Sequence, residues 1–127
     1  MKDEVPKPLR ERTKAYALRI IKLYAALPRT TEAQVIGRQL LRSGTSVGAN
    51  YREGYRARSS AEMAAKFGIS IQELDETAYW IELLIEADSV AEPLVAPLLD
   101  ETNQLIAIFT TSVRKLRQKG KGDGTTT

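Results

Sequence analysis

The amino-acid sequence predicts an all-α protein, folded as an antiparallel up-and-down four-helix bundle. Leu, Ile and Ala are abundant, aromatic residues make up only 6% of the chain, and no segment alternates apolar and polar residues between turn signals, as strands do. Long segments instead repeat apolar residues in steps of three and four, which is the period of a helix. A chain of 127 residues suits one domain with one hydrophobic core, which we assign to residues 1–118.

The first helix is expected from about Leu9 to Ala26, and Pro28 closes it because a proline ring cannot continue a helix. Its apolar face consists of Tyr16, Ile20, Leu23 and Leu27. The second helix is expected to be capped by Thr30 or Thr31 and to reach about Arg56.

The third helix is predicted to begin at a capping box formed by Ser59 and Glu62. Its apolar positions are spaced by three or four residues, as in the seam of a helix bundle. These positions are Met63, Phe67, Ile71, Leu74, Ala78, Ile81 and Ile85.

The fourth helix has two possible starting points. Ser89 and Glu92 form a second capping box, but Pro97 would then fall inside the helix. We therefore expect a start near Ala96, with Pro97 in the first turn. The predicted seam consists of Leu98, Thr102, Leu105, Phe109, Val113 and Leu116. Residues 119–127, rich in Gly and Thr, are expected to form a flexible tail.

Residues 42–54 read as a helix, but small and polar residues stand where Leu and Ile would be expected. A polar stripe on one helical face is formed by Ser43, Ser46, Asn50 and Glu53, spaced by three, four and three residues. The stripe continues the apolar line of Ile36 and Leu40. We therefore expect Asn50 and Glu53 to point at other helices rather than at water, where they need hydrogen-bonding partners.

Two interpretations of this segment differ in function. In the first, which we favour, small residues let two helices approach closely and the polar groups fix their register. The small residues are Gly44, Gly48, Ala49 and Gly54. Three glycines inside a helix cost about 3 kcal/mol relative to alanine, and close helix contact is the simplest source of an offset. In the second interpretation, the segment forms a ligand-binding or catalytic pocket.

Two patterns connect the chain with a known family. Ser-x-x-Ser-hydrophobic-x-x-Asn-x-x-Glu covers residues 43–53, and Glu-x-x-Glu-x-x-Tyr-Trp covers residues 73–80 and includes Glu73 and Glu76. Together with Leu27-Pro28 and Gln39-Leu40-Leu41-Arg42, they resemble the four-helix-bundle proteins first noticed as open reading frames in intervening sequences of bacterial large-subunit ribosomal RNA genes. The resemblance covers about residues 10–117.

The resemblance implies an antiparallel bundle that assembles into pentameric rings with a basic surface. One branch of that family is the accessory subunit of a reverse transcriptase in diversity-generating elements and contacts both the polymerase and nucleic acid. A reverse transcriptase is therefore one partner that the resemblance implies. Most members have no assigned biochemical activity, so the resemblance says more about fold than about function.

Charge is distributed unevenly, although the net charge is only +3. Residues 1–60 hold 13 Lys or Arg against 5 Asp or Glu, residues 61–101 hold 1 against 10, and residues 102–127 hold 5 against 1. Such charges usually form solvated faces. The functional alternative is a head-to-tail contact, in which the acidic side of one subunit meets the basic side of the next and a ring closes.

Basic surface outside such a contact could bind the phosphates of RNA or DNA. The candidate residues are Arg10, Arg12, Lys14, Arg38, Arg52, Arg56, Arg58, Arg114, Lys115 and Arg117. No pattern typical of base readout accompanies them, and no aromatic-rich strand offers a platform on which bases could stack.

The composition weighs against an enzyme. The chain has no Cys and no His, which removes thiol chemistry, imidazole bases and nearly all zinc and haem sites, so we expect no cofactor and no metal. Glu73 and Glu76 match half of the paired carboxylates that hold magnesium in all-α nucleotide pyrophosphohydrolases. The other half is missing, because Glu86 and Asp88 are two residues apart and point to different faces.

The sequence thus favours a non-enzymatic homo-oligomer that binds nucleic acid or a nucleic-acid enzyme. The alternative is a structural or regulatory protein-interaction ring without nucleic-acid contact, and a metal-dependent nucleotide hydrolase ranks third. Trp80, beside Tyr79, is interpreted as a core or interface anchor. No apolar run typical of a signal peptide or a membrane span is present, so we expect a cytoplasmic protein without membrane contact.

Overall fold

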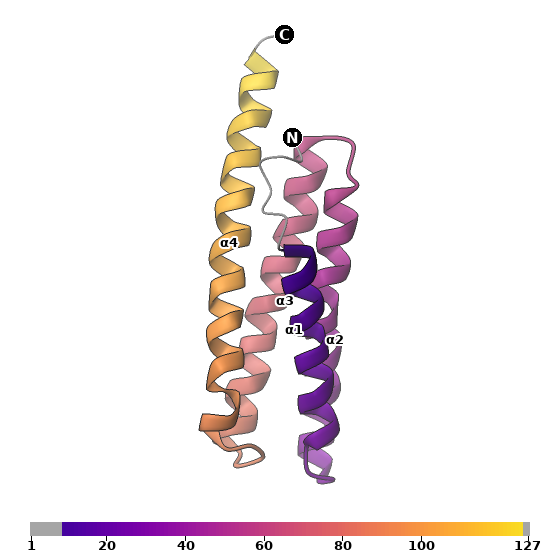
Figure 1. The fold of residues 1–127 in the computed structure, drawn as a ribbon, viewed down its shortest axis with the longest axis vertical. Coiled ribbons are helices and arrows are strands. Elements are labelled where there is room, and N and C mark those ends of the chain that lie inside the picture. Colours follow the sequence, from indigo (N-terminus) through magenta and orange to yellow (C-terminus); the bar gives the residue numbers. More distant parts are fainter. Residues whose placement is uncertain (1–8, 126–127) are drawn as a thin grey trace.

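The computed structural model describes residues 9–125, and their side chains over residues 9–120. Four helices make up this part of the chain: α1 (Leu9–Ala26), α2 (Thr31–Tyr55), α3 (Ser60–Glu86) and α4 (Glu92–Thr125). Successive helices run in opposite directions along a common axis (Figure 1). The predicted all-α four-helix bundle is confirmed.

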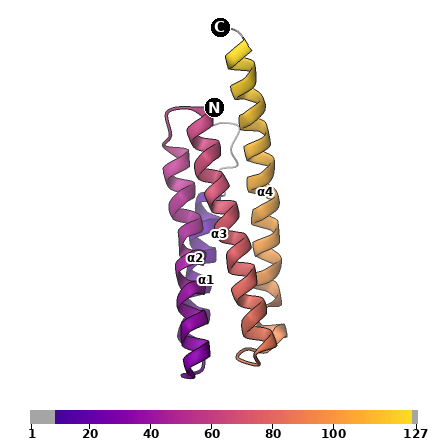
Figure 2. The ribbon, with the colours of Figure 1, turned by 180° about the vertical axis from the view of Figure 1, so that it is seen from behind.

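The helices do not contact one another equally. α2 packs against both α1 and α3, and α3 also packs against α4, whereas α1 and α4 touch at few points. The view from behind shows α3 between α2 and α4, and α4 extending beyond the other helices at its C-terminal end (Figure 2). The up-and-down topology brings the start of α1, the end of α2, the start of α3 and the C-terminal half of α4 to the same end of the bundle.

The caps of α2 and α3 follow the sequence. Thr30 caps α2 by accepting a hydrogen bond from the backbone N–H of Ala33, at 3.3 Å. Ser59 caps α3 by accepting from the N–H of Glu62, at 3.1 Å. In the other half of a capping box, the Glu62 carboxylate would accept from the N–H of Ser59. In the structure it accepts instead from the N–H of Arg58.

The seam of α4 is confirmed, since all six predicted residues are buried. The predicted seam of α3 is wrong at three of its seven positions. The buried positions are Ser70, Thr77 and Leu84. The predicted residues next to them in the sequence are only half-buried, namely Ile71, Ala78 and Ile85. The observed row alternates steps of four and three strictly, and its two hydroxyls are buried because they hydrogen-bond to α2.

α4 begins at Glu92, four residues before the predicted start. Pro97 therefore lies inside the helix, where it lacks the N–H that would bond to the carbonyl of Pro93. That loss falls close to the helix N-terminus, and the early start buries Val95, which is 2% exposed. At the other end α4 continues to Thr125, so residues 119–125 of the predicted tail are helical, whereas residues 126–127 lie outside the described part of the chain.

Candidate functional site

The polar stripe is only partly directed at other helices. Ser43 is fully buried and faces α3. The prediction is wrong for Asn50, whose amide donates to the backbone carbonyl of Ser46 in its own helix, at 3.0 Å. The prediction that Glu53 points away from water is also wrong, because this side chain is 57% exposed. It pairs with Lys66 of α3 at the surface. The physical reason is that the stripe runs from the buried α2–α3 contact at Ser43 to the half-buried and exposed margin of α2 at Asn50 and Glu53.

The glycines of α2 do allow close helix contact, as the first interpretation predicted. A Cβ atom on Gly44 would lie 2.7 Å from Cγ1 of Ile20 in α1, and one on Gly54 would lie 2.8 Å from the ring of Phe67 in α3. Both distances are too short for a side chain, so α2 approaches its two neighbours at these positions. Ala49 does not take part, because it is exposed.

A hydroxyl from every helix is buried in the core. Ser43 Oγ of α2 lies 2.7 Å from Thr77 Oγ1 of α3, and Tyr16 Oη of α1 lies 2.7 Å from Thr102 Oγ1 of α4. Thr77 and Thr102 also donate to the carbonyl four residues earlier in their own helices. Ser43 and Tyr16 are therefore the donors in the two hydroxyl pairs, and all four groups are satisfied.

These hydroxyls belong to one group, which we call the hydroxyl cluster (Tyr16, Ser43, Thr77 and Thr102). Burial raises the pKa of the Tyr16 hydroxyl to about 12, while hydrogen bonding with Thr102 and with Thr77 acts in the opposite direction. Thr77 therefore lies near both Ser43 and Tyr16. The cluster ties the four helices together in one register, because a shift of any helix would leave a buried hydroxyl unpaired.

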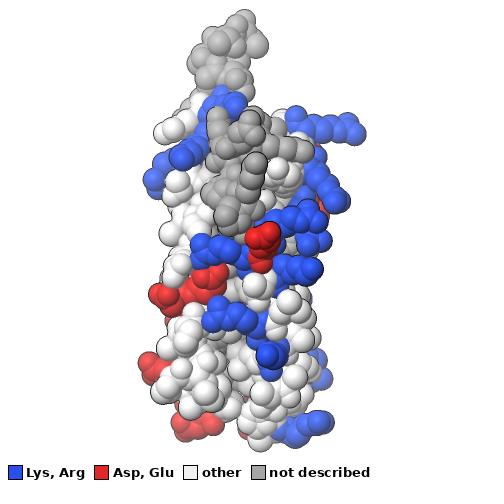
Figure 3. Space-filling model, in the orientation of Figure 1, with Lys and Arg blue, Asp and Glu red and all other residues white. Residues whose placement is uncertain are grey.

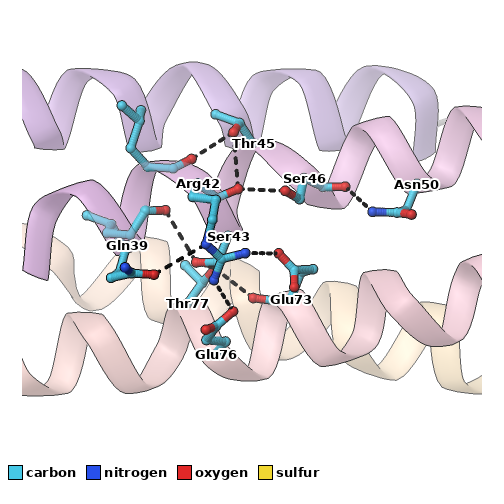
Figure 4. A network of polar contacts seen from close by, with 11 residues as sticks. Gln39, Arg42, Ser43, Thr45, Ser46, Asn50, Glu73, Glu76 and Thr77 are labelled. Atoms are coloured by element: carbon cyan, nitrogen blue, oxygen red, sulfur yellow. Dashed lines mark hydrogen bonds and ion pairs between the residues drawn. The ribbon is translucent and has the colours of Figure 1, made fainter.

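Beside the hydroxyl cluster, Arg42 of α2 lies between two carboxylates of α3 (Figure 4). Its Nη1 is 3.1 Å from Glu73 and its Nη2 is 2.6 Å from Glu76. The hydrogen bond with Glu76 is the main cause that raises the pKa of the Arg42 guanidinium, and both carboxylates add to it. Arg42 is 49% exposed, so this contact adds little to stability and leaves the guanidinium accessible at the surface.

The structure gathers seven of the ten predicted phosphate-binding residues at one end of the bundle. We call this the basic end, and it consists of Arg10, Arg52, Arg56, Arg58, Arg114, Lys115 and Arg117. In Figure 3, Lys and Arg lie along both sides of the upper half of this face and continue down its right side, whereas most Asp and Glu lie toward its lower left. Among the described residues, none of the seven side chains forms an ion pair with an Asp or Glu.

The other three basic candidates lie apart from that end. Arg12 makes a bidentate contact with Glu101 of α4, at 2.7 and 3.1 Å, which occupies the guanidinium that we expected to meet phosphate. Lys14 is exposed about one helical turn after Arg10 in α1, and Arg38 is exposed in the first half of α2. The sequence could not show the Arg12 contact, because its partner is 89 residues away.

Trp80 and Tyr79 lie on α3, with their ring centres 5.1 Å apart. Tyr79 is 52% exposed and Trp80 is half-buried. Within the described part of the chain, the buried Nε1 of Trp80 has no hydrogen-bonding partner. A buried N–H without an acceptor is unfavourable, and an acceptor from another molecule would remove that cost.

The carboxylates considered for magnesium have other contacts. Glu73 and Glu76 both bind Arg42. Asp88 follows the end of α3 with a φ of 59°, in the left-handed region, where it lets the chain turn toward α4. Over the residues that the structure describes, no three Asp or Glu side chains are grouped so as to hold a metal ion. None of the described helices is long and apolar enough to cross a membrane.

Sequence reasoning missed Arg42, Ser70 and Thr77. Arg42 belongs to the motif Gln39-Leu40-Leu41-Arg42, but its neighbours in the sequence give no sign of its partners. These partners, Glu73 and Glu76, are 31 and 34 residues away. Ser70 and Thr77 continue the strict alternation of four and three that begins at Met63. That spacing was the available signal, and the preference for apolar residues at core positions obscured it.

Comparisons with known proteins agree with the fold. A family model described as 23S rRNA-intervening sequence protein matches residues 9–111. Among solved structures, the chain is similar to a protein of unknown function from the S23 ribosomal protein family of Bacteroides thetaiotaomicron VPI-5482. The two share 31% sequence identity with a TM-score of 0.78, over 83% of this chain and 97% of that one. No curated protein matches the chain.

Proposed function

The chain belongs to the 23S rRNA-intervening sequence protein family, and we propose that it is a non-enzymatic homo-oligomer that binds nucleic acid or a nucleic-acid enzyme through its basic end. The observation that carries this proposal is the gathering of seven basic side chains at that end without carboxylate partners among the described residues. Unpaired Lys and Arg on one surface attract the phosphates of RNA or DNA. A reverse transcriptase, as the family resemblance implies, is one enzyme that such a protein would serve.

Assembly is proposed on the separation of charge. Exposed acidic side chains are concentrated on α3 and the start of α4, and include Asp75, Glu82, Glu86, Glu92 and Asp100. Contact of this acidic surface with the basic surface of a second copy is heterologous, and such contacts form a ring when the rotation from one copy to the next closes. We expect light scattering at low salt to give about five times the mass of one chain, as the family resemblance implies. A monomer at micromolar concentration would exclude the ring.

Nucleic-acid binding is tested by titrating labelled RNA and DNA of unrelated sequence at several salt concentrations. We expect similar affinity for all sequences, and a logarithm of affinity that falls with log salt by about 0.7 to 0.9 per neutralised phosphate. Replacement of Arg52, Arg56 and Arg58 by Glu should weaken binding to all sequences. A matched control replaces Arg19, Lys22 and Arg29, which are exposed basic residues outside the basic end, and should retain most of the affinity.

The second candidate is a protein-interaction ring without nucleic acid. The unpartnered Nε1 of Trp80 and the exposed ring of Tyr79 favour it, because an amphipathic aromatic pair on an outer face suits a protein contact. The same titration separates the two candidates. An intact oligomer that binds neither RNA nor DNA at low salt would favour the interaction ring, and sequence-specific binding that is insensitive to salt would contradict the proposed phosphate contacts.

A further inference from the structure

A cavity at the basic end lies between the start of α1 and the last turns of α2. Its volume is about 260 Å³. Among the residues that the structure describes, its lining is formed by Arg10, Tyr51, Arg52, Tyr55 and Arg56. Three of the five lining side chains are thus cationic, and the other two are aromatic rings with a hydroxyl.

The positive charge of this cavity is not balanced by the carboxylates nearest in sequence. Glu53 pairs with Lys66, and among the described residues Arg10, Arg52 and Arg56 have no ion pair. Elsewhere in the bundle, buried or half-buried contacts of arginine are matched, as between Arg12 and Glu101. Arg52 lies in the last turn of α2, where a cation offsets the negative end of the helix dipole, and over residues 9–120 the charges of Arg10 and Arg56 have no carboxylate within ion-pair distance.

The cavity is closed on its inner side by the core. Tyr51 is only 3% exposed, and its ring stacks on Phe67 at a centre distance of 5.6 Å. Its hydroxyl is close enough to Arg10 for that charge to lower the pKa of Tyr51, although burial and Tyr55 raise it by more. At neutral pH the hydroxyl is therefore protonated and can donate a hydrogen bond to an anion in the cavity.

We propose that this cavity binds the phosphate of a phosphomonoester, with Arg10, Arg52 and Arg56 around the phosphate and the Tyr51 hydroxyl as an additional donor. A phosphomonoester carries a charge of about −1.5 to −2 near pH 7 and three strongly accepting oxygens, which suits three guanidinium groups. A phosphodiester carries one charge, and its chain has to leave on two sides. Because Tyr51 closes the inner side of the cavity, a terminal phosphate can enter it more deeply than a phosphate inside a continuous strand.

Two sources present the same group. One is a small phosphomonoester such as a nucleoside 5′-monophosphate, and the other is the 5′-phosphate at the end of a nucleic-acid strand. Only the second depends on the proposed nucleic-acid function. In that case the cavity adds recognition of the strand end to phosphate contacts elsewhere on the basic end.

The test compares two oligonucleotides of one sequence, one with a 5′-phosphate and one with a 5′-hydroxyl, and uses adenosine 5′-monophosphate against adenosine as the small probe. Calorimetry at low salt measures all four. We expect the phosphorylated member of at least one pair to bind about tenfold or more tightly than the other member, because hydrogen bonds to a charged group are among the strongest in proteins. If both pairs show no preference for the phosphate, the proposal is overturned.

Variants locate the preference. Arg10→Gln and Arg56→Gln, both at exposed positions, should abolish it, whereas Arg29→Gln, an exposed arginine outside the cavity, should retain it. Tyr51→Phe keeps the ring stack and should reduce the preference severalfold. If each of the two single variants, Arg10→Gln and Arg56→Gln, still prefers the phosphorylated ligand, the phosphate-binding site lies elsewhere. If both oligonucleotides bind equally well, the proposed nucleic-acid function stands but recognition of the strand end is excluded. If neither oligonucleotide binds and adenosine 5′-monophosphate still binds more tightly than adenosine, the cavity binds small phosphomonoesters and the proposed nucleic-acid function is excluded.

Discussion

Thr102→Val should destabilise the bundle more than Tyr16→Phe, although both changes remove the same hydrogen bond. The replacement of Thr102 by the isosteric Val removes the acceptor at 2.7 Å from the buried Tyr16 hydroxyl, which is left with Thr77 as its remaining hydroxyl neighbour. An unsatisfied buried donor costs about 1 to 3 kcal/mol. Tyr16→Phe removes the donor instead, and Thr102 keeps its hydrogen bond to the carbonyl of Leu98, so the expected loss is about 0.5 to 1.5 kcal/mol.

The double variant sharpens this comparison. With Phe at position 16 and Val at position 102, no polar group of the pair remains to be satisfied, so the double variant should be more stable than Thr102→Val alone. Urea unfolding measures all four proteins, with a fixed protomer concentration because subunit association adds to apparent stability. If Thr102→Val is no worse than Tyr16→Phe, or if the double variant is the least stable protein, the inference that these buried hydroxyls depend on one another is incorrect.

Three further changes have outcomes that the structure determines. The pKa of Tyr16 is raised to about 12 in the folded protein, so its contribution to stability is complete below pH 10 and is lost as pH rises to 12; unfolding free energies over this range should fall by about 2 to 3 kcal/mol more in the wild type than in Tyr16→Phe. Gly44→Ala should lower the melting temperature because its Cβ meets Ile20, whereas Gly68→Ala, with open space around its Cβ, should stabilise α3 by about 0.5 to 1 kcal/mol. A lower melting temperature for Gly68→Ala would contradict this reasoning. Asp88→Gly should raise stability by up to about 1 kcal/mol in thermal unfolding, since glycine adopts a φ of 59° without strain, and a decrease would show that the Asp88 side chain has a contact of greater value.

Local signals predicted the helices well and the contacts between helices poorly. The bounds of α1 and the cap at Thr30 follow from residues within one turn of them, and they were correct. Pro97 was misplaced because the burial of Val95, which favours an earlier start, depends on packing against the rest of the bundle. Asn50 was assigned a partner on another helix because the direction of the stripe was known only relative to its own helix.

The candidate site shows the same division. The sequence identified the basic residues, and the up-and-down order of the helices was sufficient to bring most of them to one end. The sequence could not show that Arg12 is bound by Glu101, whereas Arg10, two residues earlier, lines a cavity. Whether an arginine is available for a ligand is decided by carboxylates far away in the sequence, and only the structure places them.

The contact between α1 and α4 is sparse, so α1 packs closely against α2 alone, and its hydrogen bonds to α4 are those of Arg12 and Tyr16. Elements with few tertiary contacts open in separate, low-energy events while the rest of a protein stays folded. Amide hydrogens of α1 should therefore exchange with solvent through such partial openings, and those of α3, which is packed between α2 and α4, only through complete unfolding. A ligand bridging Arg10 to the end of α2 would fasten α1 at its free end and slow that exchange, so this protein can report occupancy of its basic end through the dynamics of one helix.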